Sequence, residues 1–355
     1  MGLSSGVLRT VYPFAAIVDQ DRLKRALLLN AINPRIGGVL IRGAKGTGKS
    51  TAVRALVDLL PSVEVVADCP FRCSPSDPTN MCEICSSKVK RGEELHVGSR
   101  KMEMIDLPIG ATEDRVVGTL NIERAIREGV RALEPGILAE ANQNVLYVDE
   151  INLLPDHITD VILDAAASGW NTVEREGISV QHPSRLILVG TMNPEEGELR
   201  PQLLDRMALH TEISTIQDPS LRVDIMKRNI EFESDPIGFR EKFRQPQEDL
   251  MEKMQRAKTI LPKVNVSDQL FEVVARMCIS LHVDGHRPDI MIVKAARALA
   301  SFNGRSEVEP QDLLDSAVLA VSHRTRNLGM DPPASENQIE GEFKKALSLV
   351  TGHTG

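Results

Sequence analysis

The stretch Gly43–Ser50 reads GAKGTGKS and follows a short apolar run, GVLI, with only Arg42 between them. It matches the pattern G-x-x-x-x-G-K-[ST], in which glycines let backbone N–H groups turn toward phosphates. Lys49 would supply positive charge to the outer phosphates, and the hydroxyl of Ser50 would ligate Mg²⁺. Residues 49–60 have helical spacing, so a helix N-terminus would face the anion. The sequence therefore predicts a site for a nucleoside triphosphate.

Two acids end a later apolar run, NVLYVDE, at residues 144–150. Asp149 is expected to hold Mg²⁺ through its water shell, and Glu150 to polarise an attacking water. Asn193 ends the next apolar run, RLILVGTMN, where its amide could orient that water. The alternative for Asn193 is a turn-forming role before Pro194. If these runs are parallel strands, the side chains at their carboxyl ends meet where open α/β sheets bind ligands.

Four of the five cysteines lie within the segment CPFRCSPSDPTNMCEIC, as Cys69, Cys73, Cys82 and Cys85. The spacing C-x₃-C-x₈-C-x₂-C suits a structural Zn²⁺ held by four thiolates, the interpretation we favour. An iron–sulfur cluster would use the same four ligands, and a redox role for the C-x₂-C pair is a third alternative. The fifth, Cys278, lies in an apolar helical pattern and is expected to be a buried small side chain.

Strands and helices alternate along the first part of the chain, and each strand is continuously apolar. This pattern predicts an α/β fold with a parallel sheet covered by helices on both faces. We expect the α/β domain to span residues 1–216, with a cysteine-bearing insertion at 67–104 and a hairpin insertion at about 170–184. Residues 217–330 read as a smaller helical domain, and residues 331–355 as a loop and a weak helix. A further helix is predicted at 121–133.

Composition limits the function classes. The chain of 355 residues has a formal net charge of −8 and only 3% aromatic residues, so broad nucleic-acid binding is not favoured. This argues against a DNA-linked ATPase. No apolar run approaches the roughly 18 residues of a membrane span, and no secretory signal is evident, so a cytoplasmic protein is expected.

The chain strongly resembles the AAA+ ATPase subunit of magnesium chelatase, its I subunit, over nearly its whole length. Beyond the phosphate loop, the resemblance is carried by YPFAAIVDQ, DLPIGATEDRVVGTLNIERAI, EPGILAEANQNVLYVDEINLL, GTMNPEEGELRPQLLDR and GHRPDI. It implies an AAA+ core followed by a helical lid domain. The four cysteines depart from the family pattern, so this chain resembles a cysteine-bearing variant.

The resemblance also implies roles for particular residues. Asn193 matches the first sensor, Arg206 the arginine finger that reaches a neighbouring subunit, and Arg287 the second sensor over the nucleotide. The purely structural alternative for each arginine is an ion pair. Arg206 would pair with Asp205 or Glu198, and Arg287 with Asp289. Asp149 and Glu150 match the Mg²⁺ and water-activating acids. The nucleotide-binding set adds Ile17 and Val18 beside the adenine to Gly43, Ala44, Lys45, Gly46, Thr47, Gly48, Lys49, Ser50 and Thr51.

The function implied is that of an ATP-hydrolysing motor. Such a subunit forms a ring, commonly a hexamer, with ATP and Mg²⁺ as cofactors. It works with an AAA+-like partner carrying an integrin-type metal-binding domain and with a large porphyrin-binding subunit, to insert Mg²⁺ into protoporphyrin IX. The cysteines leave open a cobalt or nickel chelatase ATPase, or a MoxR-like chaperone acting in metalloenzyme maturation. Partner contacts are expected at residues 175–177 and 105–120.

Overall fold

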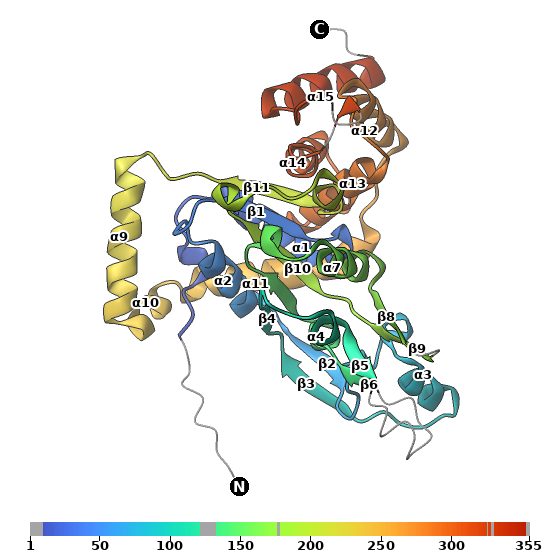
Figure 1. Cartoon of the computed structure of the whole chain (residues 1–355). Helices are drawn as coiled ribbons and strands as arrows, with labels where there is room; N and C mark the ends of the chain where they lie inside the picture. Colours follow the sequence, from blue (N-terminus) through green and yellow to red (C-terminus); the bar gives the residue numbers. More distant parts are fainter. Residues whose placement is uncertain (1–9, 121–132, 176–177, 325, 328–329, 353–355) are drawn as a thin grey trace.

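The computed structural model describes residues 10–120, 133–175, 178–324, 326–327 and 330–352 (Figure 1). The predicted helix at 121–133 falls outside these ranges, apart from Leu133, with which a short strand begins. No helix in the described ranges is long and apolar enough to cross a membrane.

Five parallel strands form the central sheet in the order β11-β1-β10-β7-β4. Their bounds are β1 Val39–Gly43, β4 Met104–Leu107, β7 Val145–Val148, β10 Ile187–Met192 and β11 Leu209–Ile213. Because all five run the same way, the phosphate loop after β1, Asp149 after β7 and Asn193 after β10 lie along one edge. The predicted parallel sheet is confirmed, and its polar ends converge as expected.

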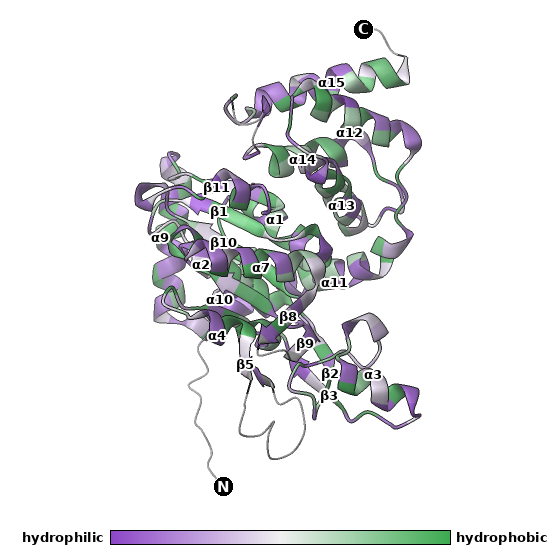
Figure 2. Cartoon of the chain, turned by 45° about the vertical axis from the view of Figure 1, so that its right-hand side comes forward, coloured by the Kyte–Doolittle hydropathy of each residue, from purple (hydrophilic) through white to green (hydrophobic). Residues whose placement is uncertain are grey.

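Alternate residues of each strand point into two different cores. Val39 and Ile41 of β1 pack with helices α1 (Asp21–Ile32) and α2 (Lys49–Leu59) on one face. Leu40 packs on the other face with α4 (Glu113–Val117), α6 (Ile137–Glu140) and α7 (Asp156–Ser168). Both faces of the sheet are thus covered, which explains why the strands are apolar without alternation. In Figure 2 the ribbon of β1 is coloured as hydrophobic, whereas outer helices such as α15 also carry hydrophilic residues.

The predicted strand at 63–66 exists but does not belong to the central sheet. As β2 (Ser62–Val66) it pairs antiparallel with β3 (Val97–Lys101) in a separate ribbon. The sheet position next to β7 is taken by β4, inside the segment 105–120 that we expected to be a partner-binding loop. Residues 105–107 are therefore a strand and not a loop. The expected partner contact of this segment stays a prediction.

Between β2 and β3 the cysteine-bearing segment forms a 3₁₀ turn, η3 (Pro78–Asn80), and helix α3 (Glu83–Lys90). Two further antiparallel pairs lie nearby: β5 (Gly118–Leu120) with β6 (Leu133–Pro135), and β8 (Trp170–Arg175) with β9 (Ile178–Pro183). Short elements complete the α/β region: η1 Phe14–Ala16, η2 Pro34–Ile36, η4 Ile151–Leu153, η5 Pro194–Glu196 and α8 Pro201–Leu204.

The rest of the chain is helical: α9 Pro219–Ser234, α10 Pro236–Lys242, α11 Arg244–Ile260, η6 Leu261–Lys263, α12 Asp268–Ser280, α13 Arg287–Phe302, α14 Pro310–Val321 and α15 Glu336–Thr351. Figures 1 and 2 place α9 and the bundle α12–α15 on opposite sides of the α/β core. The C-terminal helix expected in residues 331–355 is present as α15. α15 runs for 16 residues, with Ile339, Phe343 and Ala346 buried in the bundle.

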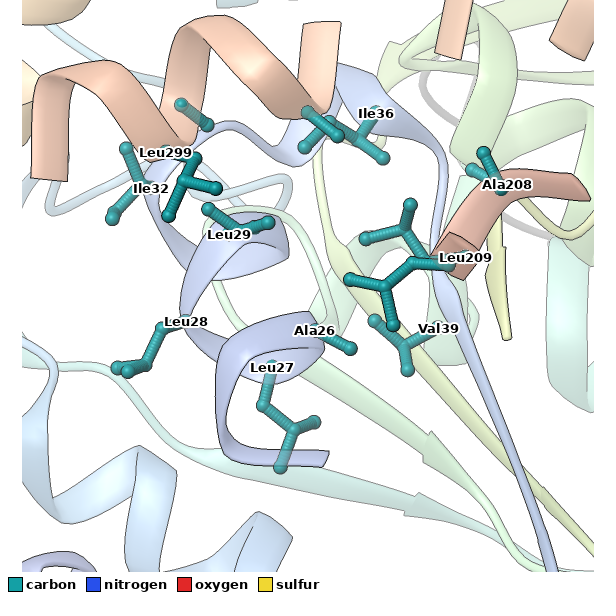
Figure 3. Close-up of a cluster of buried hydrophobic side chains, with 14 of the residues drawn as sticks. Ala26, Leu27, Leu28, Leu29, Ile32, Ile36, Val39, Ala208, Leu209 and Leu299 are labelled. Carbon is teal, nitrogen blue, oxygen red and sulfur yellow. The ribbon is translucent and has the colours of Figure 1, made fainter. Parts of the chain in front are cut away.

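The helical bundle shares a core with the sheet through α1. Figure 3 shows Leu28, Leu29 and Ile32 of α1 beside Leu299 of α13, with Val39 and Leu209 of the sheet on the other side of the helix. Leu29 is 1% exposed and Val39 is fully buried. This continuous apolar packing fixes the bundle to the face of the sheet that carries α1.

Candidate nucleotide-binding site

The phosphate loop joins β1 to α2 with two glycines in the left-handed region. Gly46 has φ of 79° and Gly48 of 80°, a conformation in which a side chain would be strained, and a Cβ at either position would project into open space. The Nζ of Lys49 donates to the carbonyl oxygens of Gly43 and Ala44, the latter at 3.0 Å. Burial lowers the pKa of Lys49, and the charges of Asp149 and Glu150 oppose that shift.

Two hydroxyls orient Asp149 at the carboxyl end of β7. Tyr147 donates to Oδ1 of Asp149 at 2.9 Å, and Thr191 of β10 donates to the same oxygen at 2.5 Å. The Thr191 oxygen also accepts from the backbone N–H of Glu150 at 3.1 Å. Burial, followed by the bond to Asp149, raises the pKa of Tyr147. This network locks β7 to β10 where both acids emerge, and a carboxylate so held fits a Mg²⁺ ligand beside Ser50.

Glu150 stands at the turn after β7 in a left-handed conformation, with φ of 51°. The Nζ of Lys45 lies 3.7 Å from its Oε1 and 2.5 Å from Oε1 of Glu196. The bond to Glu196 is the main cause that raises the pKa of Lys45. Lys45 thus bridges the phosphate loop to the two acids that follow β7 and β10.

Asn193 follows β10 and is 2% exposed. Its Oδ1 accepts a hydrogen bond from the backbone N–H of Glu195 at 3.3 Å, so Asn193 caps the start of the η5 turn, which begins at Pro194. The turn-forming role that the sequence left open is therefore present. The bond to Lys45, and in smaller part the Asn193 side chain, lowers the pKa of Glu196, so these three residues lie together beside the loop.

A hollow lies beside the phosphate loop and is lined by Ile17 and Val18, the two residues expected against an adenine. Gln20 at its edge donates to the carbonyl of Thr47 at 3.3 Å, which ties this segment to the loop. The far wall comes from α9, through Arg222, Ile225 and Asn229. The remaining lining residues are Tyr12, Lys45, Gly46, Gly48, Thr51, Ala52, Ser214, Thr215 and Ile216.

Arg206 does not reach this site in its own chain. Its Nη1 lies 2.9 Å from Oδ1 of both Asp160 and Asp164, one turn apart on α7. The sequence had offered Asp205 or Glu198 as its structural partner, and neither is used; Glu198 instead pairs with Arg42 at 2.5 Å. The arginine is 35% exposed, so it stands on an outer face of the molecule.

Arg287 begins α13 and is absent from the lining of the hollow. It lies near Arg324, whose pKa is lowered to about 10 by burial and, in smaller part, by the charge of Arg287. Arg324 donates to the backbone carbonyls of Asp205 and Met207, which flank Arg206. Arg287 does not line the hollow of its own chain, because the bundle packs on the α1 face, across the core from α9. Its expected role as the second sensor stays a prediction.

The four cysteines of the insertion converge. Their sulfur atoms all lie within 4.8 Å of one another, and three of the residues are buried. The Sγ of Cys69 is 3.5 Å from that of Cys73 and 3.8 Å from that of Cys82, so no disulfide joins them. A tetrahedral Zn²⁺ with bonds of about 2.3 Å places its sulfurs about 3.8 Å apart, which this geometry fits. Cys278 is buried in α12, as predicted.

Several contributors to the site were missed by sequence reasoning. Tyr147 and Thr191 lie inside apolar strands, and Glu196 and Lys45 read as ordinary surface charges. The available signal was positional, because Tyr147 stands two residues before Asp149 and Thr191 two before Asn193. Side chains two apart on a strand share a face, so each hydroxyl could have been expected beside a functional residue.

These features define a class. They are those of an AAA+ ATPase: the strand order, the phosphate loop, the paired acids after β7 and the C-terminal helical bundle. The AAA lid domain model matches residues 272–345. A putative ATPase from Cytophaga hutchinsonii shares the fold, with a TM-score of 0.57 over 96% of this chain and 91% of that one, at 16% identity.

Closer comparisons specify the family. The model described as magnesium chelatase, subunit ChlI, matches residues 121–200. A magnesium-chelatase subunit ChlI homolog from Methanocaldococcus jannaschii is 54% identical, with 96% of this chain and 93% of the relative covered. Magnesium-chelatase subunit ChlI from Synechocystis sp. is 52% identical, with 96% of each covered. A BchI–BchD complex of magnesium chelatase contains a 43% identical chain, covering 94% of this chain and all of that one, with a TM-score of 0.54. The chain belongs to the magnesium chelatase subunit ChlI family.

Proposed function

We propose that this chain is the ATP-hydrolysing motor subunit of a tetrapyrrole metal chelatase, driving insertion of Mg²⁺ into protoporphyrin IX held by a partner subunit. One observation supports it above all: within a chain of this family, the phosphate loop, Asp149, Glu150 and Asn193 share one edge of the sheet. ATP would bind with its triphosphate on residues 43–51 and its adenine against Ile17 and Val18. Ser50 and Asp149 would hold Mg²⁺, which supplies charge neutralisation at the phosphates.

The remaining steps belong to this chain's own residues. Lys49 would exchange its carbonyl partners in the loop for phosphate oxygens. Glu150, set by the turn after β7, would take the proton of the attacking water, and Asn193 would orient that water. Charge spread over the transferred phosphoryl group is then stabilised by guanidinium groups.

Those guanidinium groups come, in our proposal, from a neighbouring copy. Arg206 and Arg287 lie near each other on the α7 and α13 side, while α9 and the hollow lie on the other. A contact between two unlike faces repeats head to tail and closes into a ring when the rotation allows it. α9 supports this, because it has no buried residue and leaves Val223, Met226 and Ile230 41%, 55% and 65% exposed. A hexamer is the expected closed form.

The partners proposed are an AAA+-like subunit with an integrin-type metal-binding domain, matching the BchI–BchD pairing of the similar structure, and a large porphyrin-binding subunit. The four cysteines are proposed to hold a structural Zn²⁺ apart from the metal that is inserted.

Reconstitution tests the function. The purified chain is combined with its cognate partner subunits, ATP and protoporphyrin IX, and metallation is followed by porphyrin fluorescence with Mg²⁺, Co²⁺ or Ni²⁺ supplied in turn. We expect ATP-dependent insertion of Mg²⁺. If Co²⁺ or Ni²⁺ is inserted and Mg²⁺ is not, the chain serves a chelatase for that other metal. If ATP is hydrolysed and no metal is inserted, the proposed chelatase function is wrong.

A further inference from the structure

The cysteine cluster lies at the edge of the sheet opposite the nucleotide site. Its neighbours are the residues that precede β7 and β10, whereas Asp149 and Asn193 follow those strands. The apolar core around the sulfurs is small, with only Val66, Phe71, Met81 and Ala139 buried beside them. Such a core is too small to hold a loop of about thirty residues without a further crosslink.

One buried asparagine connects the cluster to the sheet. The Nδ2 of Asn142 donates to the carbonyl oxygens of Phe71 and Arg72 at 2.9 and 3.1 Å, and to Oδ1 of Asn80 at 3.1 Å. Its Oδ1 accepts from the backbone N–H of Arg185 at 2.9 Å. The backbone between the first and third cysteines is thereby joined to the amino end of β10.

The side chain of Arg185 adds a second connection to the same loop. Its Nη1 donates to Asp77 and its Nη2 to Thr79, each at 2.5 Å. Asp77 and Thr79 form the η3 turn between Cys73 and Cys82. Arg185 thus binds the loop at a turn whose two ends are flanked by Cys73 and Cys82.

A third connection runs to the β8–β9 hairpin. Phe71, between Cys69 and Cys73, stacks on His182 of β9 with ring centroids 4.8 Å apart and planes 4° apart. His182 is fully buried and its Nε2 lies 3.0 Å from Nδ2 of Asn171 on β8. Asn171 also donates to the carbonyl of Val117 at 3.0 Å, so both strands of the hairpin are fixed at their base.

We propose that one Zn²⁺ on Cys69, Cys73, Cys82 and Cys85 acts as a clamp that holds the β8–β9 hairpin against the sheet. With the ion bound, Phe71 and the η3 turn are fixed, and His182 and Arg185 have rigid partners. Without it, the hairpin is released, while the phosphate loop, which among the described residues has no contact with the cluster, keeps its form. The released chain is expected to keep its ATP hydrolysis, which we class with the proposed function. This last step rests on the proposed function; the clamp itself does not.

Elemental analysis and hydrogen exchange test the clamp without any assay of chelation. Protein purified without oxygen is expected to hold one zinc per chain. Removal of zinc with a thiol-reactive mercurial and a chelating dye, then reversal with thiol, should raise exchange of the amides at 178–182 at least about tenfold. Amides of β7 should keep their protection, and added Zn²⁺ should restore the hairpin. Iron with visible absorbance, no bound metal, or zinc removal without faster exchange of the hairpin would each overturn the proposal.

Two variants separate the metal from the clamp. Phe71→Leu keeps all four thiolates, so it should retain zinc yet lose hairpin protection. Cys82→Ser combined with Cys85→Ser should lose both. Cys278→Ala, which removes a buried cysteine elsewhere, is the control and should lose neither. If the hairpin amides of Phe71→Leu exchange as slowly as those of wild type, the stacking of Phe71 on His182 does not hold the hairpin. If wild-type chain inserts no metal with its partners, the proposed function fails while the exchange results still decide the clamp.

Discussion

At the scale of single residues, Lys49 illustrates how the site is prepared for an anion. Its ammonium group is partly buried, which lowers its pKa, and it donates only to carbonyl oxygens of its own loop. A bound triphosphate offers charged acceptors in their place. The residue is therefore held at the position where negative charge arrives.

Lys49→Ala is expected to reduce ATP hydrolysis at least about 100-fold, because a preorganised cation at the transferred phosphoryl group is lost. Phosphate release in the steady state measures the effect, with ATP affinity determined separately. Lys101→Ala removes an exposed lysine whose Nζ lies 3.0 Å from Asp58, which keeps its second partner Arg240, so this matched control should stay near wild type. Equal rates for the two variants would show that Lys49 does not act on phosphate.

Glu150→Gln is expected to keep ATP binding and lose turnover by about 100-fold or more, because an amide cannot accept the proton of the attacking water. Binding of a fluorescent ATP analogue and single-turnover hydrolysis separate the two effects. Glu196→Gln makes the same chemical change at the other partner of Lys45 and should cost far less. A Glu150→Gln variant that hydrolyses ATP normally would remove the assigned general base.

The phosphate loop and the two acids were predictable because their chemistry demands fixed residue types at fixed spacing. The hydroxyl network of Tyr147 and Thr191 was not, because it depends on which strands are neighbours. β7 and β10 are adjacent in the sheet but about 40 residues apart in the chain. The partner of Arg206 was missed for the same reason, since Asp160 and Asp164 reach it only through the packing of α7 beside α8.

At the scale of elements, two buried histidines lie where β11 meets the helical bundle. His210 of β11 and His323 after α14 have ring centroids 5.2 Å apart, and Nε2 of His323 lies 3.0 Å from the carbonyl of Met207. Burial lowers the pKa of His210 to about 4 and depresses that of His323 below its usual range. Both rings are therefore neutral in the folded protein at neutral pH.

This burial predicts a loss of stability in mild acid. Unfolding frees each ring to bind a proton near pH 6.5, so the unfolded state binds more protons below that pH and the free energy of unfolding falls. His210 alone lowers the free energy of unfolding by about 1.4 kcal/mol for each unit of pH decrease between pH 6.5 and about 4. Urea unfolding at several pH values measures the slope. His210→Leu should have a slope shallower by that amount, and parallel slopes would contradict the account.

The element prediction succeeded where the hydrophobic pattern was long and failed where it was short. β1, β7 and β10 were recognised because strands buried on both faces are continuously apolar. β4 has only four residues and follows the cysteine-bearing segment, so no pattern distinguished it. Val63–Val66 had the stronger apolar signal, yet Glu64 is exposed and the strand joins a two-stranded ribbon. Choosing between them requires the sheet order, which local sequence does not contain.

At the scale of the whole molecule, the two halves of the proposed catalytic machinery face in different directions. The hollow beside the phosphate loop is bounded by α9, while Arg206, just after α8, lies against α7. Asp160 and Asp164 occupy successive turns of α7 and hold the guanidinium group on the surface. In our proposal these acids orient the arginine until a neighbouring site, rich in phosphate charge, competes for it. The placement of Arg287 near Arg206 could not be predicted from sequence, because it depends on how the bundle docks on α1.

The proposed head-to-tail arrangement makes a quantitative prediction for mixed rings. Glu150→Gln subunits lack the base but retain Arg206, and Arg206→Ala subunits lack the arginine but retain the base. Compared with wild type, Arg206→Ala alone should hydrolyse ATP at least about 1,000-fold more slowly. Glu150→Gln alone should hydrolyse it about 100-fold more slowly. In an equimolar random mixture, about a quarter of the interfaces join an intact base to an intact arginine, so about a quarter of wild-type activity should return. Recovery must depend on mixing before ring assembly. A mixture no more active than its separate components, under conditions where light scattering shows mixed rings, would place Arg206 outside its neighbour's site.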